Sequence, residues 1–109
     1  GGGVSRSEDE RFADILGAIE RCLEYAPHLH SDELGSMAYD AVLRNLAVVG
    51  EAVRSLPDET RSTMPDVPWA SIAGLRNVVV HEYFRVNPDL VRDIVDHQLT
   101  DLATAIRNR

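Results

Sequence analysis

A chain of 109 residues with a formal net charge of −7 has room for one modest core and no general attraction for a polyanion. No apolar run approaches the ~20 residues that a membrane-spanning helix needs, and no charged-then-apolar leader precedes the first predicted helix. The single cysteine, Cys22, cannot form an internal disulfide, which is typical of the reducing cytoplasm. We therefore expect a single cytoplasmic domain over 1–109, in which residues 1–6 are a disordered tail or a tag remnant.

The charge balance also limits how the chain could bind RNA. Its eighteen acidic residues outnumber eleven basic ones, and every basic residue is an arginine. Arginine suits bidentate contacts with phosphate, although its exclusive use could equally reflect a GC-rich genome. Any RNA binding must then depend on a local arginine cluster, or on two clusters joined by dimerisation. Neither DNA nor a membrane is expected as a partner.

Residues 7–25 are predicted to form the first helix. Ser7 and Glu10 have the spacing of a capping box, and Pro27 ends the segment. Cys22 lies beside the apolar stripe, where a small buried thiol is expected rather than a reactive one. Apolar residues recur at helical spacing at Phe12, Ile15, Leu16, Ile19 and Leu23.

The loop after this helix carries two histidines. His28 and His30 are two residues apart, so a metal pair is conceivable. Solvated histidines are the preferred interpretation, because no third ligand is near in sequence.

Residues 32–56 are predicted to form the second and longest helix. Ser31 is a suitable N-cap, and two acids follow it in the first turn, where the helix dipole favours them. Arg44, Asn45 and Glu51 are polar positions on this helix. Arg44 and Glu51 are either surface charges or a structural ion pair with other helices, or they support the active groove. The apolar stripe comprises Leu34, Met37, Ala38, Ala41, Val42, Val49, Ala52, Val53 and Leu56.

The second half of the chain is predicted to contain two further helices. A short turn over 58–64 leads to a helix over 68–83, with Pro68 in its first position. The β-branched run 78–80 favours a strand by propensity, but a lone strand would have no partner, so a helix is predicted. A last helix over 88–107 begins with Asn87 as N-cap, and His97 lies off its apolar line and should be exposed. Four long helices and one short one predict an all-α antiparallel bundle.

A polar set lies on the third long helix, at Arg76, Asn77, His81 and Tyr83. Arginine can neutralise a phosphate, and histidine can take or give a proton near neutral pH. On an ideal helix Asn77 and His81 share a face, whereas His81 is about 140° round from Arg76. One straight helix therefore cannot grip a phosphate with both residues, so either it is distorted or a second copy completes the site. A zinc hydrolase ranks last, because His81 has no second ligand four residues away.

The stretch PWASIAGLRNVVVHEYF (68–84) resembles the signature of the HepT-like branch of the HEPN proteins, whose motif reads R-x4-H-x-Y. The run AVLRNLAVVGEAVRSL (41–56) resembles the same family's second long helix, and P-x-V-P-W (65–69) resembles its entry to the motif. The resemblance covers most of residues 11–102. It implies a HEPN-type helical bundle that forms a homodimer, with paired motifs lining a shared cleft.

The resemblance also implies a function. Such proteins are toxins that cleave RNA without a metal or cofactor, and each is neutralised by a minimal nucleotidyltransferase antitoxin of the MntA type. On this basis Arg76 and His81 are the expected catalytic residues, Asn77 supports them, and Tyr83 is the residue that the antitoxin modifies with AMP. The downstream run FRVNPDLVRDIV departs from the usual pattern, because it lacks an expected glycine and tryptophan.

Two other interpretations remain open from the sequence. The chain could be a non-catalytic subunit that binds a nucleotidyltransferase or a nucleotide through the groove beside Tyr83. It could also be a structural helical dimer in which Arg76 pairs with a carboxylate such as Glu51 or Glu82, and His81 caps a helix end.

Overall fold

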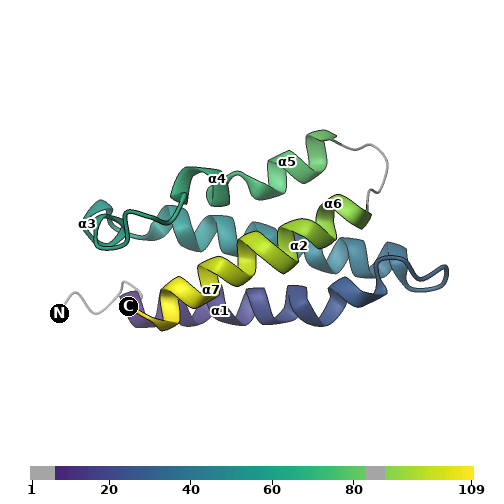
Figure 1. The fold of residues 1–109 in the computed structure, drawn as a ribbon, viewed down its shortest axis with the longest axis horizontal. Coiled ribbons are helices and arrows are strands. Elements are labelled where there is room, and N and C mark those ends of the chain that lie inside the picture. The colour runs from purple at the N-terminus through teal and green to yellow at the C-terminus, as the bar shows by residue number, and fades with distance from the viewer. Residues whose placement is uncertain (1–6, 83–87) are drawn as a thin grey trace.

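The chain folds as an antiparallel bundle of helices (Figure 1). The computed structural model describes residues 7–82 and 88–109, with the side chains of 80–82 also outside the description. The elements are α1 (Glu8–Tyr25), the 3-10 turn η1 (Ala26–His28), α2 (Gly35–Ser55), α3 (Asp58–Ser62), α4 (Trp69–Ala73), α5 (Leu75–Glu82), α6 (Pro88–Asp93), the π-helical η2 (Ile94–Leu99) and α7 (Thr100–Arg107). No strand occurs in these residues, so the all-α prediction is confirmed, including the helical state of 78–80.

The two longest helices, α1 and α2, form a hairpin and run antiparallel along most of their length (Figure 1). The α4–α5 segment runs back along one side of α2, and the continuous rod from α6 to α7 crosses over α1 and α2. One cluster of buried side chains draws on all of these elements and forms the core. Within the described residues, no helix combines the length and apolar character needed to cross a membrane.

The start of α1 follows its predicted capping residue, whereas α2 begins later than predicted and Pro68 is the N-cap of α4 instead of its first residue. Ser7 Oγ accepts a hydrogen bond of 3.1 Å from the Glu10 amide, as a capping box requires. Ser31 Oγ accepts one of 3.0 Å from the Leu34 amide, and the Ser31 carbonyl accepts one of 2.8 Å from the Gly35 amide. A turn over 32–34 therefore precedes the α-helix, which begins at Gly35 rather than at residue 32. The predicted cap at Asn87 lies outside the described residues.

Three residues of the predicted apolar stripes are exposed: Leu23, Leu34 and Met37. On α1 the buried face is centred on Phe12, Ile15, Ile19 and Cys22, so Leu23 lies at its margin. Leu34 precedes α2, and Met37 points away from the face that buries Ala38 and Val42. The predictions for these three positions were wrong because apolar spacing alone does not locate the edge of a buried face.

Two predicted helices depart from a regular α-helix. The helix expected over 68–83 is divided at Gly74 into α4 and α5. The helix expected over 88–107 is continuous, but its middle turn is π-helical. There the Thr100 hydroxyl donates to the carbonyl of Val95, five residues earlier, at 3.2 Å. Such wide turns cannot be predicted from apolar spacing, because the same buried residues fit an α-helix.

Candidate active-site groove

A polar groove of about 420 Å³ lies between α2 and the α4–α5 segment. Its walls are Leu46, Ala47, Gly50, Glu51, Arg54, Ala73, Arg76 and Asn77. Arg76 and Asn77 stand in the first turn of α5, and both side chains are exposed. The structure thus brings two of the predicted site residues into one groove with charged residues of α2.

The other two predicted site residues are described less fully. The backbone of His81 belongs to α5, one helical turn after Asn77, so these two positions share a face as predicted. The side chain of His81 and the whole of Tyr83 lie outside the described residues. The roles of His81 and Tyr83 therefore stay predictions.

The break at Gly74 sets the direction in which α5 leaves. Gly74 has φ −95° and ψ 0°, and its amide donates to the carbonyls of Ala70 and Ser71 at 3.2 Å. A methyl group added at Gly50 of α2 would come within 3.0 Å of the Ala73 carbonyl oxygen. The absence of a side chain at Gly50 therefore allows α2 to approach the end of α4 closely.

Arg54 ties these elements together from the groove. Its Nη2 donates to the Ala73 carbonyl at 2.8 Å, and its Nη1 lies 3.0 Å from Glu51 Oε1. The guanidinium thus satisfies a carbonyl at the helix break just before Arg76. Sequence reasoning missed Arg54. The only signal was its position three residues after Glu51, which permits an ion pair on one helix face.

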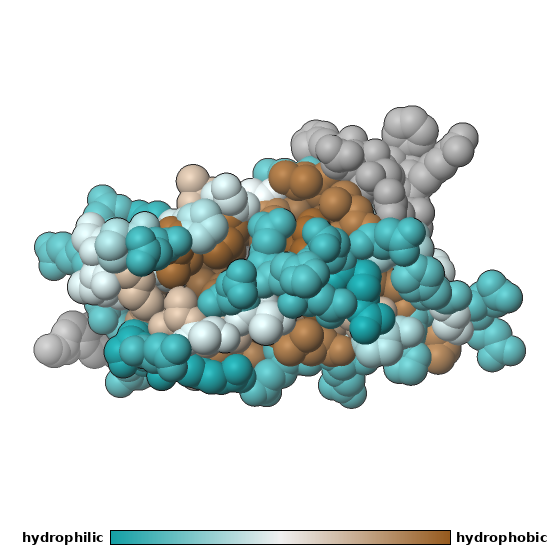
Figure 2. Space-filling view, in the orientation of Figure 1, coloured by the Kyte–Doolittle hydropathy of each residue, from teal (hydrophilic) through white to brown (hydrophobic). Residues whose placement is uncertain are grey.

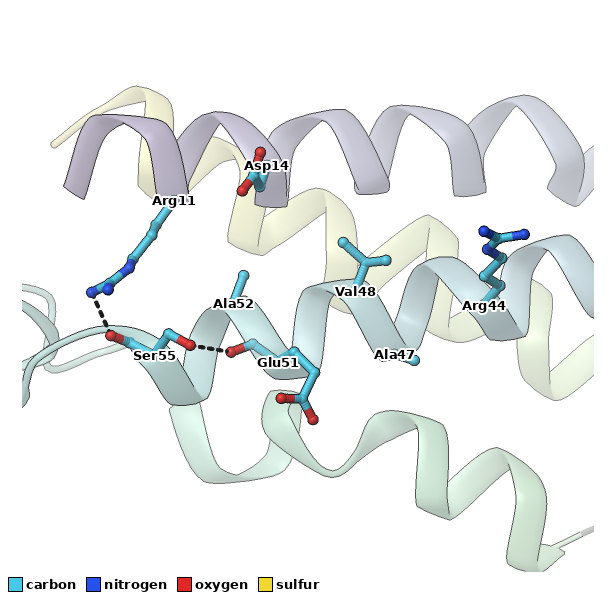
Figure 3. Close-up of a pocket in the computed structure, with 8 residues that line it drawn as sticks. All are labelled: Arg11, Asp14, Arg44, Ala47, Val48, Glu51, Ala52 and Ser55. Carbon is cyan, nitrogen blue, oxygen red and sulfur yellow. Dashed lines mark hydrogen bonds between the residues drawn. The ribbon is translucent and has the colours of Figure 1, made fainter. Parts of the chain in front are cut away.

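The sequence left the roles of three polar residues of α2 open, and the structure places each of them in different surroundings. Glu51 is exposed and pairs with Arg54 on its own helix, not with another helix, and it lines the groove. Its support of an active site stays a prediction. Arg44 is exposed and lines the neighbouring surface between α1 and α2 (Figure 3). Asn45 is structural, since it is buried, accepts a 2.8 Å bond from Arg21 Nε and donates one to the Ala41 carbonyl.

The remaining candidate residues lie away from the groove. His30 Nε2 is 2.8 Å from Asp89 Oδ1 of α6, so this histidine has an acidic partner and is not merely solvated. His97 is exposed, as predicted. Cys22 is buried, which raises the pKa of its thiol to about 12 and keeps it protonated. Among the described side chains, no group of three or more histidines, cysteines or acids could hold a metal ion.

The chain is thus an all-α bundle in which one helix, α5, carries both an arginine that lines a polar groove and a histidine. The profile of the family described as "Ribonuclease HepT-like" matches residues 15–108. The chain belongs to this family of ribonucleases, within the HEPN superfamily, and RNA is the substrate class of that family. The predicted family is confirmed.

Several curated proteins share this similarity. The chain is 36% identical to "Putative RNase MJ0127" of Methanocaldococcus jannaschii over 75% of its own length and 69% of that protein. It is 37% identical to "Putative RNase TTE0752" of Caldanaerobacter subterraneus subsp. tengcongensis over 62% of its length and 60% of that protein. It is 27% identical to "Probable ribonuclease HepT" of Thermococcus cleftensis over 91% of its own length and 92% of that protein. No solved structure matches.

Proposed function

We propose that the chain is the toxin of a HepT/MntA-type toxin–antitoxin pair, a cytoplasmic homodimeric endoribonuclease that needs no metal. The observation that carries this proposal is the groove in which Arg76 and Asn77 stand together, one turn from the backbone of His81 on α5. Family membership and the R-x4-H-x-Y motif support it. The catalytic assignment of Arg76 and His81, with Asn77 supporting them, is part of the proposal.

The chemistry follows from the residue types. An imidazole of His81 takes the proton of a ribose 2′-hydroxyl, whose oxygen then attacks the adjacent phosphorus. The bond to the 5′-oxygen breaks, and that oxygen receives a proton from an imidazolium. Arg76 stabilises the negative charge that builds up on the phosphate oxygens, and Asn77 donates to them or orients His81. A cyclic phosphate and a free 5′-hydroxyl are the products.

The course of α5 supports a site shared between two copies. Positions 76 and 81 lie within one helix, so they are separated by about 140° around its axis. The break that the structure contains is at Gly74, before Arg76, and cannot bring these two positions onto one face. A homodimer in which the 69–84 segments face each other would combine Arg76 of one copy with His81 of the other.

Purified wild-type protein is expected to cut a labelled single-stranded RNA at the same rate with and without EDTA. General acid–base groups and an arginine supply the catalysis in this proposal, so removing divalent cations should change nothing. Gel analysis of the labelled fragments measures the rate. Cleavage that stops in EDTA and returns with added Mg²⁺ would contradict metal independence. A dimer that never cuts RNA would favour a non-catalytic binding subunit.

Modification of Tyr83 by the nucleotidyltransferase partner and ATP is expected to silence cleavage. An AMP group two residues from His81 would obstruct the groove and bring negative charge to it. Tyr83→Phe should cut RNA like the wild type but escape this control. Intact-mass spectrometry with peptide mapping, run beside the RNA assay, locates the label. Label on Tyr25 or Tyr39 with Tyr83 unmodified would contradict the regulatory role.

A further inference from the structure

One face of α2 is left uncovered between α1 and the α4–α5 segment (Figure 3). This face, which we call the α2 strip, consists of Arg44, Ala47, Val48 and Glu51. Val48 is an exposed aliphatic side chain, Ala47 is half-buried, and the two charged residues flank them on the same helix face. An apolar centre between charges of opposite sign is the arrangement of a small protein interface.

The strip is complementary to itself. Residues 44 and 51 are equidistant from the midpoint between Ala47 and Val48. A two-fold axis through that midpoint and perpendicular to α2 would therefore place Arg44 opposite Glu51 of a second copy, and Ala47 opposite Val48. The two-fold generates both ion pairs at once, because a C2 interface repeats each contact. Parallel packing would instead set arginine against arginine and glutamate against glutamate, so the charges select the antiparallel arrangement.

The charge of this face also suits a second copy. The chain as a whole carries −7, so two copies repel each other unless their contact surfaces are locally balanced. The strip lies in a second groove, between α1 and α2. Four charged residues line this second groove and their formal charges cancel: Arg11, Asp14, Arg44 and Glu51. Ala47 at the centre has little side-chain volume, which lets two helices approach closely.

The strip adjoins the candidate active-site groove. Ala47 and Glu51 line both surfaces, so a helix packed on the strip would stand at the edge of the groove that holds Arg76 and Asn77. The partner's arginine at position 44, paired with Glu51, would then add positive charge beside Arg54 and Arg76. Local positive charge is what an acidic chain needs in order to hold a phosphate backbone.

From this geometry we infer that α2 forms the two-fold interface of the homodimer, through antiparallel pairing of Arg44 with Glu51 of the second copy. The inference rests on the proposed homodimeric function and adds the residues that join the copies. A polyanion is disfavoured as the occupant of the strip, because Glu51 would repel phosphate groups and the apolar Ala47 and Val48 offer them no hydrogen bond.

Charge reversal tests the pairing. Arg44→Glu and Glu51→Arg are each expected to weaken the dimer by roughly 100-fold, because each places two like-charged pairs in the interface. An equimolar mixture of the two variants should form a heterodimer, since glutamate at 44 and 51 in one copy then faces arginine at 51 and 44 in the other. Sedimentation velocity at micromolar concentration measures both effects, and circular dichroism checks that each variant is folded.

Matched controls come from the ion pair between Arg107 and Glu20, which lies on the α1–α7 side of the molecule with a separation of 3.7 Å. Arg107→Glu and Glu20→Arg introduce the same charge changes away from the strip and should leave the dimer intact. Single strip variants that dimerise like these controls, or folded variants whose mixture stays monomeric, would overturn the interface. A wild-type monomer would also overturn it.

RNA cleavage separates this inference from the proposed function. Wild-type protein that cuts RNA while the strip variants remain dimeric would keep the ribonuclease and remove the interface. A dimer that responds to charge reversal as expected but never cuts RNA would keep the interface and remove the catalytic proposal.

Discussion

His81→Ala is expected to slow RNA cleavage by roughly 10²–10⁴-fold while leaving helical content and dimerisation unchanged, since His81 is proposed as the proton-transfer group. Arg76→Ala should cause a comparable loss, because charge on the transferring phosphate would be left unneutralised. Arg76 is exposed in the first turn of α5, so its removal leaves no buried cavity. Initial rates on labelled RNA in EDTA measure both losses.

Two variants control for charge and side-chain type. His97→Ala removes an exposed histidine on the π-helical segment η2, where it lies 3.5 Å from Asp93. Arg92→Ala removes an arginine that pairs with Asp96 at 2.8 Å, on α6 and away from the groove. Both should cut RNA at nearly the wild-type rate. If His81→Ala cuts as fast as His97→Ala, the proposed catalytic role of His81 is wrong.

Leu99→Ala is expected to lower the free energy of unfolding by about 2–5 kcal/mol. Leu99 is fully buried on η2, within the core cluster, so truncation removes apolar contacts and leaves a cavity. A typical domain has only about 5–15 kcal/mol of net stability, so the loss should be obvious as a lower urea midpoint. Urea unfolding followed by circular dichroism provides the measurement.

Leu34→Ala is the matched control for this stability prediction. It makes the same chemical change at a side chain that is 44% exposed, before the start of α2. Its effect should stay within about 0.5 kcal/mol. Equal destabilisation by the two substitutions would mean that Leu99 is not the core residue that its burial indicates.

Local signals in the sequence were sufficient for most of the fold. Apolar spacing located the helices, and Ser7 makes the capping bond that its position predicted, whereas Ser31 bonds within the turn that precedes α2. Helical state over 78–80 was predicted against β propensity, because no other segment offered a strand to pair with. The exposed Leu23, Leu34 and Met37 show the limit of this reasoning, since spacing identifies a stripe but not where neighbouring helices stop covering it.

The sequence likewise predicted some features of the candidate site and not others. The stretches 41–56 and 65–84 were sufficient to identify the family, and the residue types at positions 76 and 81 suggested phosphate chemistry. The groove beside Arg76 could not be predicted, because it is formed by α2 residues that lie far away in the chain. Arg54 was missed for the same reason, as its bond to the Ala73 carbonyl spans nineteen residues.

By itself, the sequence determined the helical state of the described segments and the presence of a polar set on the motif helix, because backbone propensity, capping and side-chain chemistry act over a few residues. Only the tertiary structure decided that the motif helix breaks at Gly74 and that the groove lies against Gly50, Glu51 and Arg54. The groove depends on the close approach of α2 to α4, a long-range contact that Gly50 permits and that no local pattern specifies.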